Sequence, residues 1–567
     1  APTRVRWRYI STAGDIKDLP APSARPADLA TGAITTPSGK STVPLIVRYE
    51  QGVVNRSLYE IASIDPTPGN DADQEDAAWN HKLIYRYGGG CGTTFGQGRA
   101  LTTAADPAFL EQGYALATAS FNTFAVQCND VLSAETTMMV KERFIEEFGQ
   151  PAFTLGEGQS GGSMQIHLIA QNYPGLLDGA VALLPFPDLV TVSSGIADCR
   201  LLDRWYATPA GKTLSPAQRT AINGHASAET CAAWEKAFPD LLNPSTGCDP
   251  AIPKSQIYDP TTNPTGLRCT IQDANINQYG RNDATGFAER PLDNVGVQYG
   301  LNALNEGTIS FDQFLSLNQA IGGYDLDGQF QTDRETADPE VVARAYETGR
   351  VSTGVGDQRK IPIIDINVFD DPTGDIHDRF RAFSLRDRLT EGQSPNVTPG
   401  FQIWTREPTS TTDFDATTKQ AGIDAVRVVD RWLTAIEADR SGGSRTDTLE
   451  RNRPGVAVDN CLPPGTAKPI IGLHVYDTPG PCQDRYPISG DPRTAAGAPR
   501  QNDVIKCTLK DVDPLDYQQS ITTAQFDRLS VVFPDGVCDW REMGVGQSSP
   551  TMTDRTYDEV VTPEQLA

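Results

Sequence analysis

One serine stands where the surrounding residues could activate it as a nucleophile. Residues Gly158 to Gly162 read GQSGG and fit the pattern G-x-S-x-G. A short apolar run, Pro151 to Leu155, precedes them, and Met164 to Tyr173 follows with helical spacing. A strand, a tight glycine-flanked turn, a serine and a helix make up a nucleophile elbow. The segment predicts Ser160 as the nucleophile; the alternative is a glycine-rich loop with an idle serine.

A serine hydroxyl also needs a base, and the chain has five histidines. His377 follows a predicted strand at 361–369, and loops at the carboxyl ends of strands are where α/β enzymes assemble their sites. We therefore predict His377 as the base, the alternative being an ordinary residue at a helix start. The other histidines are in less suitable places: His81 at the start of a strand, His167 along the helix after Ser160, His225 in a predicted lid and His474 in the C-terminal region.

The oxyanion of a tetrahedral intermediate needs two hydrogen-bond donors. The backbone N–H of Gly161 follows the nucleophile, and the run Gly88-Gly89-Gly90 follows another predicted strand. We predict that Gly161 provides one donor and that Gly89 or Gly90 provides the second. The alternative is a turn in which backbones pack tightly. The run lacks the G-x-G-x-x-G pattern of nucleotide sites.

The elements that position these residues alternate between strands and helices over 45–189 and again over 356–440. This alternation predicts an α/β core, a mostly parallel sheet with helices on both faces. Residues 190–355 lose the strand pattern and hold four cysteines, which predicts an inserted lid. Residues 1–44 are rich in Pro, Ala, Ser and Thr and predict an extended N-terminal arm. Residues 441–567 are loop-rich and predict a disulfide-stapled C-terminal extension packed on the core.

Ten cysteines without any C-x-x-C motif predict disulfides and export. The default pairing joins sequence neighbours: 91–128, 199–231, 248–269, 461–482 and 507–538. The chain starts at Ala1 without an initiator Met, which fits removal of a signal peptide or simple trimming. A net charge of −25 argues against nucleic acid and anionic membranes as partners, and no apolar run is long enough for membrane insertion.

Several of these segments together resemble the α/β-hydrolases of the tannase and feruloyl-esterase type. The segments are Trp79-Asn80 before Gly88-Gly89-Gly90, then Gly113-Tyr114-Ala115-Leu116, Ser160-Gly161-Gly162 and the run from Tyr173 to Gly179. The resemblance covers about 75–190 and, more loosely, 355–440. The whole chain is more similar still to a family of exported bacterial proteins without an assigned function. The resemblance implies an α/β-hydrolase fold and ester hydrolysis by a serine nucleophile.

The resemblance also implies an orienting carboxylate after the strand at 361–369, where Asp371-Pro372 aligns best. We therefore expect Asp371 in this role, with Asp375 as its closest rival and Asp188 as another; each could instead cap a helix or turn. One feature of the family is missing. Tannase-like enzymes carry a cysteine just before the nucleophile, joined to a cysteine beside the catalytic histidine, whereas this chain has Gln159 there and neither His nor Cys in 404–408.

The sequence therefore predicts a secreted serine esterase that acts through an acyl-enzyme on an aromatic, polymeric or oligomeric ester. An amidase would use the same machinery, and a catalytically inert binding protein on a hydrolase scaffold is the competing class. No cofactor is expected. One acidic loop, with Asp325, Asp327, Asp333 and Glu335, leaves calcium as an alternative, although it lacks the ligand spacing of a 12-residue calcium loop.

Overall fold

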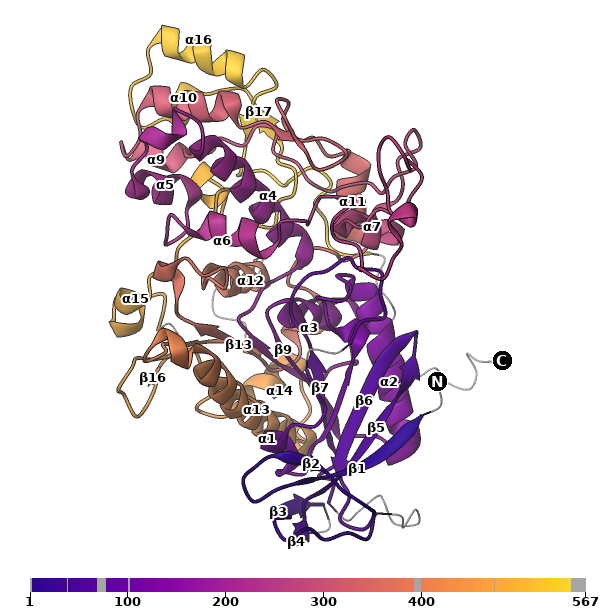
Figure 1. Cartoon of the computed structure of the whole chain (residues 1–567). Helices are drawn as coiled ribbons and strands as arrows, with labels where there is room; N and C mark the ends of the chain where they lie inside the picture. The colour runs from indigo at the N-terminus through magenta and orange to yellow at the C-terminus, as the bar shows by residue number, and fades with distance from the viewer. Residues whose placement is uncertain are drawn as a thin grey trace.

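The structure is a computed structural model, and it describes residues 3–37, 39–68, 78–99, 102–391, 399–473 and 475–551. In this part of the chain one mixed sheet forms the lower half of the molecule, below a mainly helical upper half (Figure 1). Its strand order is β16-β15-β14-β13-β10-β9-β7-β8-β6-β5-β1-β2. The strands are β1 (Arg4–Ile10), β2 (Ile16–Asp18), β5 (Ile46–Val54), β6 (Ser57–Ile64), β7 (Lys82–Tyr87), β8 (Ala115–Ala119), β9 (Phe153–Gln159), β10 (Gly179–Leu183), β13 (Ile363–Val368), β14 (Phe401–Arg406), β15 (Asn460–Leu462) and β16 (Ile470–Ile471).

The central strands, from β8 to β15 in this order, are parallel, and antiparallel pairs stand at both edges. Alternate side chains of each central strand enter two apolar layers, so that Leu83 and Tyr85 face one layer and Ile84 faces the other. Helices α2 (Asp130–Phe148), α3 (Gly161–Asn172) and α12 (Phe380–Thr390) cover the first face. Helices α1 (Pro107–Leu110), α13 (Phe414–Ala438) and α14 (Arg445–Arg451) cover the second. The predicted α/β fold, with helices on both faces of a mostly parallel sheet, is confirmed.

The N-terminal segment differs from the predicted arm. Strands β1 and β2 belong to the main sheet, and β1 pairs antiparallel with β5. Along the chain, between β2 and β5, β3 (Thr31–Thr36) and β4 (Gly39–Pro44) form a hairpin. The sequence from Arg4 to Tyr9 alternates arginine with Val, Trp and Tyr, which is the period of an edge strand. The Pro- and Ala-rich composition of the whole segment obscures that local alternation.

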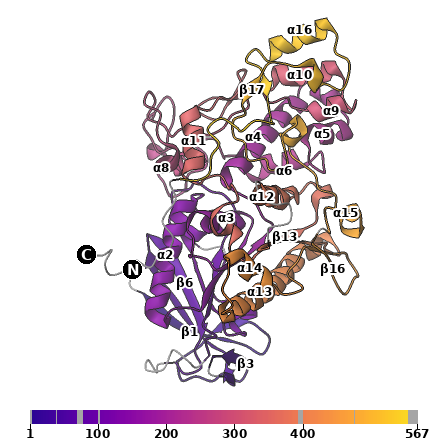
Figure 2. The ribbon, with the colours of Figure 1, turned by 180° about the vertical axis from the view of Figure 1, so that it is seen from behind.

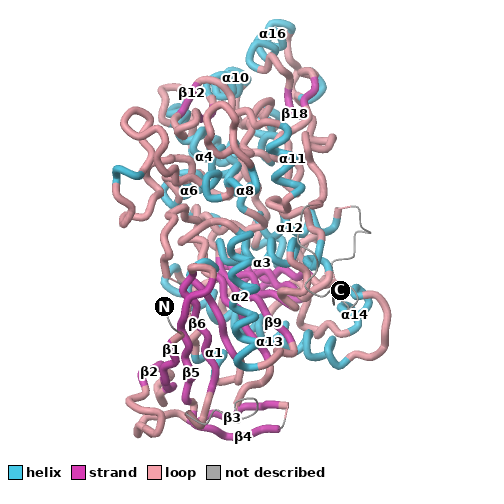
Figure 3. The backbone as a smooth tube through the Cα atoms, turned by 90° about the vertical axis from the view of Figure 1, so that its right-hand side faces the viewer, coloured by secondary structure: helices cyan, strands magenta, loops and turns pink. Residues whose placement is uncertain are grey.

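Between β10 and β13 the chain leaves the sheet and forms the upper half of the molecule, in which helices and loops predominate (Figure 3). We call residues 190–355 the lid. Its elements are α4 (Leu189–Tyr206), α5 (Pro216–Asn223), α6 (Thr230–Ala237), α7 (Ile271–Ala274), α8 (Ile276–Tyr279), α9 (Leu301–Asn305), α10 (Phe311–Ala320), α11 (Pro339–Glu347) and the short pair β11 (Gly323–Tyr324) and β12 (Phe330–Gln331). Seen from behind, α3 and α12 lie directly beneath the lid helices α4 and α6 (Figure 2).

The C-terminal segment does more than pack on the core. Its first part adds β15 and β16 to the sheet and contains α15 (Pro481–Arg485). Its later part, with β17 (Leu509–Lys510), α16 (Thr523–Val532) and β18 (Val537–Cys538), shares an apolar cluster with the lid. In that cluster Leu529 and Phe533 pack with lid residues such as Phe314. The segment therefore joins the lid to the sheet; residues 552–567 lie outside the described part.

Five disulfides join the ten cysteines in the default pairing of sequence neighbours, which is confirmed. They are Cys91–Cys128, Cys199–Cys231, Cys248–Cys269, Cys461–Cys482 and Cys507–Cys538. Within the described ranges, no helix combines the length and the apolar composition that crossing a membrane requires.

Candidate active site

Ser160 lies in a sharp turn between β9 and α3, as the sequence predicts. Its backbone has φ 58° and ψ −122°, a conformation that is strained for a residue with a side chain. The turn is held by the Ser160 N–H, which donates to the carbonyl of Leu183 at 2.9 Å. A Cβ atom added to Gly162 would lie 2.5 Å from the carbonyl oxygen of Tyr87, and one added to Gly158 would lie 2.9 Å from Gly162. The two flanking glycines are therefore needed because neighbouring backbones touch there.

His377 lies beside Ser160 although 217 residues separate them in sequence. Its Nε2 atom is 3.0 Å from the Ser160 Oγ atom, which is hydrogen-bonding distance. His377 belongs to the loop between β13 and α12, and α12 begins only at Phe380, so the residue is not at a helix start. The parallel order of β9, β10 and β13 brings the ends of these strands to one edge of the sheet. The structure thus brings together the predicted nucleophile and the predicted base.

The carboxylate that contacts His377 is that of Asp375, and our expectation for Asp371 requires correction. Asp375 Oδ1 lies 2.8 Å from the His377 Nδ1 atom, and it also accepts a hydrogen bond of 2.8 Å from the His377 backbone N–H. Burial by itself would raise the pKa of Asp375, but the hydrogen bond and the charge of the His377 ring hold it below its ordinary value. Asp375 is therefore ionised at neutral pH and suited to stabilise an imidazolium.

Asp371 instead lies buried in a short helical turn, Asp371–Thr373, where its carboxylate accepts a hydrogen bond from the Arg379 backbone N–H at 3.2 Å. Burial, and then the nearby charge of Asp378, raise the pKa of Asp371 to about 7. The Asp371 carboxylate therefore binds the backbone of the same loop at Arg379 and does not contact His377.

The glycine-rich loop packs against the elbow. A Cβ atom on Gly161 would lie 2.0 Å from the Gly90 carbonyl oxygen, and one on Gly89 would lie 2.8 Å from the Gln159 carbonyl oxygen. Gly90 has φ +85°, which favours glycine. The disulfide between Cys91 and Cys128 ties the end of this loop to the start of α2. The structure thus places Gly89, Gly90 and Gly161 next to Ser160, and of the three, Gly90 and Gly161 also line the pocket described next.

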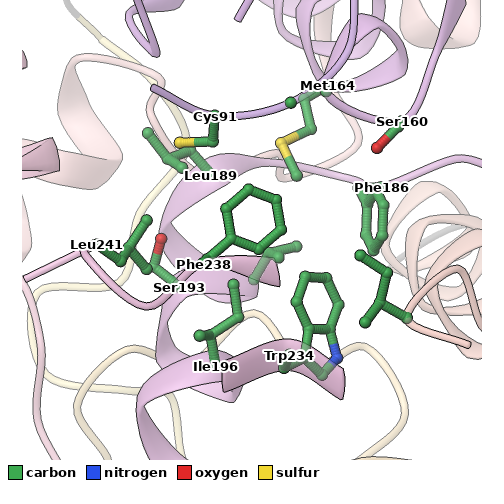
Figure 4. Close-up of a pocket in the computed structure, with 14 residues that line it drawn as sticks. Cys91, Ser160, Met164, Phe186, Leu189, Ser193, Ile196, Trp234, Phe238 and Leu241 are labelled. Atoms are coloured by element: carbon green, nitrogen blue, oxygen red, sulfur yellow. The ribbon is translucent and has the colours of Figure 1, made fainter. Parts of the chain in front are cut away.

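An apolar pocket opens beside Ser160 beneath the lid (Figure 4). The space that a water-sized sphere can occupy within it is about 20 Å³, which is room for about one water molecule. Ser160 and Ser193 provide its polar side chains. The other lining residues are Gly90, Cys91, Gly161, Met164, Phe186, Leu189, Val192, Ile196, Trp234, Phe238, Leu241 and Ile376. The pocket therefore suits a small, uncharged, apolar group.

The remaining predicted candidates have other roles. His81 stacks on Trp79 at the opposite end of β7, with 4.5 Å between the ring centroids. His167 is fully buried, with its Nε2 atom 3.2 Å from Asp365 Oδ1. Asp188 caps α4 and pairs with the buried Arg388 at 2.7 Å. His474, another of the five histidines, lies outside the described residues.

A buried chain of contacts connects the loop of His377 to the lid. Asp378 follows His377, and its Oδ2 atom lies 3.2 Å from the Nδ1 atom of His225 in the lid. The Nε2 atom of His225 lies 3.6 Å from the sulfur of Cys199, which forms a disulfide with Cys231. Among the described residues, Cys199, His225 and Cys231 form the one group whose ligand atoms are close enough together to hold a metal ion. Because both sulfurs are joined in a disulfide, the group lacks the two thiolates that a metal would require.

Three of the four acidic side chains of the loop considered for calcium are engaged elsewhere. Asp325 caps its own turn by accepting from the backbone N–H groups of Asp327 and Gln329. The Asp327 carboxylate pairs with Arg268 at 3.1 Å, and that of Glu335 pairs with Arg290 at 2.5 Å. The loop does not form a cluster of free oxygen ligands, so it gives calcium no support.

The sheet order, the elbow after β9 and the inserted lid define an α/β-hydrolase fold. The chain belongs to the tannase-like family of unknown function DUF6351, whose model matches residues 1–549. The resemblance to tannase-like proteins that the sequence indicated is therefore confirmed, and the chain is classed among the hydrolases. A comparison with curated proteins finds no match.

Solved structures similar to this chain include esterases and a peptidase. Esterase E22 is 13% identical, with a TM-score of 0.26, over 76% of this chain and 100% of that one. Feruloyl esterase B from Aspergillus oryzae is 15% identical, with a TM-score of 0.25, over 74% of this chain and 75% of that one. A prolyl endopeptidase is 11% identical, with a TM-score of 0.30, over 74% of this chain; the match spans 48% of the endopeptidase.

Proposed function

We propose that this protein is a serine esterase, with Ser160 as the nucleophile, His377 as the base and Asp375 as the orienting carboxylate. The observation that carries the proposal is the continuous contact from Ser160 Oγ to His377 Nε2 at 3.0 Å and from His377 Nδ1 to Asp375 Oδ1 at 2.8 Å. This is the arrangement of a catalytic triad, which is recognised by geometry rather than by chain order. The disulfides further support our proposal that the protein acts outside the cell.

In the proposed reaction, the Ser160 oxygen attacks the ester carbonyl carbon while its proton passes to His377 Nε2. The negative charge on the carbonyl oxygen is stabilised by the N–H of Gly161, the first residue of α3, and by an N–H of the loop at Gly90. When the intermediate collapses, His377 returns the proton to the departing alcohol and the acyl group stays on Ser160. A water molecule, deprotonated by His377, then releases the acid. Asp375 stabilises the positive charge on His377 in both steps.

The competing hypothesis is an inert binding protein, and the absence of a histidine from 404–408 is the observation that favours it. The loop after β13 provides a histidine at the right distance, together with a carboxylate for its other ring nitrogen. An inert scaffold has no need for this contact or for the strained turn at Ser160. Both features favour the enzyme. An amidase remains the second candidate because amides react through the same steps.

The test is reaction with a fluorophosphonate probe and turnover of a panel of p-nitrophenyl esters and anilides. We expect labelling at Ser160 alone, with labelling and turnover lost in Ser160→Ala and greatly reduced in His377→Ala. His81→Asn is the matched control, because His81 has φ 60°, a conformation that asparagine tolerates, and lies at the other end of its strand. An adduct on another residue, or full activity in His377→Ala, would refute the assignment. Turnover of the anilides in preference to the esters would favour the amidase.

A further inference from the structure

The proposed chemistry determines which part of a substrate occupies the pocket beside Ser160. The leaving alcohol must depart next to His377 Nε2, since that atom gives it a proton. The pocket lining includes Gly90 and Gly161, the proposed oxyanion donors, and it includes Ile376 but not His377 itself. The place of the oxyanion donors in its wall favours the acyl group, the part that remains bound to Ser160, as the occupant.

The walls of this pocket come mainly from two lid helices. Leu189, Val192 and Ile196 project from α4, and Trp234 projects from α6. Trp234 is fully buried and packs edge-on against Phe186, with 5.6 Å between the ring centroids. Phe186 in turn lies 5.6 Å from the His377 ring. In Figure 4, Trp234 lies on the opposite side of the pocket from Met164 and Ser160, and the ring of Phe238 lies between them. Trp234 therefore limits the depth that an acyl group can reach.

The separation between the two helices is fixed by a covalent bond. Cys199 of α4 and Cys231 of α6 form a disulfide, and both cysteines are fully buried in the same apolar cluster as the pocket walls. An acyl group that is too long cannot push α4 and α6 apart without breaking this packing. A pocket whose walls cannot move excludes acyl groups longer than its depth, whereas a pocket with mobile walls would adapt to them.

We propose that α4 and α6, joined by Cys199–Cys231, form a size-limiting acyl subsite with Trp234 as its specificity-determining residue. The substrate class is then esters of short, uncharged, apolar acids, and the bulk of any large substrate lies in its alcohol part. This inference rests on the proposed esterase function. It narrows the expectation of an aromatic, polymeric or oligomeric ester, because a large aromatic acid would not fit beneath Trp234.

The test is the dependence of kcat/KM on acyl length in p-nitrophenyl acetate, butyrate, octanoate and benzoate. Each methylene beyond the limit of a hydrophobic pocket costs about 10- to 200-fold, so we expect octanoate and benzoate to be at least about 10-fold poorer than the short esters. Trp234→Phe and Trp234→Ala should raise kcat/KM for the two larger esters progressively, by about 10-fold or more relative to acetate. The matched control is Trp205→Phe, since Trp205 is a buried tryptophan of α4 that does not line the pocket.

A second arm tests the disulfide. The double variant Cys199→Ala, Cys231→Ala should broaden the acyl preference in the same direction, while Cys248→Ala, Cys269→Ala, which removes another lid disulfide, should leave it unchanged. A wild-type preference for octanoate or benzoate would overturn the proposal, and so would an unchanged length profile in a folded Trp234→Phe variant. These outcomes are distinct from failure of the esterase function, in which no ester is turned over and Ser160 is not labelled.

Discussion

Replacing Asp375 by asparagine separates the charge of this residue from its hydrogen bonds. Asp375 Oδ1 accepts from both the ring and the backbone N–H of His377, each at 2.8 Å. An asparagine oxygen can accept the same bonds but carries no negative charge. A hydrogen bond to a charged group contributes about 1.5–3 kcal/mol, and each 1.36 kcal/mol is tenfold in rate. Loss of the whole charged bond, as in Asp375→Ala, therefore costs about 10- to 150-fold in kcat, and loss of the charge alone, as in Asp375→Asn, costs less.

The partial exposure of the Asp375 side chain determines where in this range of kcat losses each Asp375 variant should fall. The Asp375 side chain is 37% exposed, so water screens part of its charge. We expect Asp375→Asn near the lower end of the range and Asp375→Ala at or above the upper end, because alanine also frees the loop that holds His377. The assay is kcat at saturating p-nitrophenyl acetate, at one pH, with Ser160→Ala as the blank. The fluorophosphonate labelling rate should fall in parallel with kcat.

The matched comparison is Asp371→Asn, because Asp371 lies in the same loop, six residues before His377. Asp371 is the residue favoured by alignment, but it contacts the Arg379 backbone and not His377. We expect this variant to keep kcat within a few-fold of the wild type. Full activity in Asp375→Ala together with inactivity in Asp371→Asn would refute our assignment of the orienting carboxylate.

Three further outcomes are expected. The pKa of Asp371 is raised to about 7 in the folded protein from an ordinary value of 3.8, so the wild type should lose stability as pH rises from about 4 to about 7. Asp371→Asn should therefore be more stable than the wild type at pH 8, by up to about 4 kcal/mol in the free energy of unfolding. At pH 4 the two proteins should differ little, and denaturant unfolding measures both values. Removing the Cys91–Cys128 disulfide by a double alanine substitution should lower kcat with a smaller effect on KM, since the disulfide anchors the loop of Gly90. An unchanged kcat would argue against this loop as an oxyanion site. Thiol titration of the denatured, unreduced protein should find close to no free thiol, and several free thiols would contradict the disulfide assignment.

Local patterns in the sequence predicted the elbow and the parallel core well. The strand, turn and helix around Ser160 depend on residues within about 20 positions, and the glycines are required by contacts that any such turn makes. The strand preceding His377 was equally evident from the run Lys360 to Phe369, which matches β13 (Ile363–Val368). The sequence predicts His377 because it follows this strand and because the other histidines are less suitably placed.

The choice between Asp371 and Asp375 could not be made reliably from sequence. Alignment to the tannase type favoured Asp371, and the position of each carboxylate depends on how the loop turns after β13. One signal did exist: an aspartate two residues before a residue readily accepts a hydrogen bond from the backbone N–H of that residue. Asp375 makes this bond to His377, and the same geometry brings its oxygen to the imidazole.

The architecture of the lid and of the C-terminal segment depends on long-range packing. Leu529 and Phe533 meet lid helices more than 200 residues earlier in the chain, and short-range periodicity carries no information about such contacts. The same holds for β15 and β16, which extend the sheet with two or three residues each. Elements this short are held by their neighbours rather than by their own propensity.

The contact between His225 and Asp378 has a consequence for exchanging lids between relatives. His225 belongs to the lid and Asp378 to the loop that carries His377, and both side chains are almost completely buried. A chimera that receives residues 190–355 alone would lose the contact of the buried Asp378 carboxylate with His225 and leave it, among the described residues, only Arg381, at 3.7 Å, as a positively charged neighbour. A graft that also carries residues 370–378 would keep the pair intact. The modular unit of this protein for engineering is therefore the lid together with the loop that carries His377.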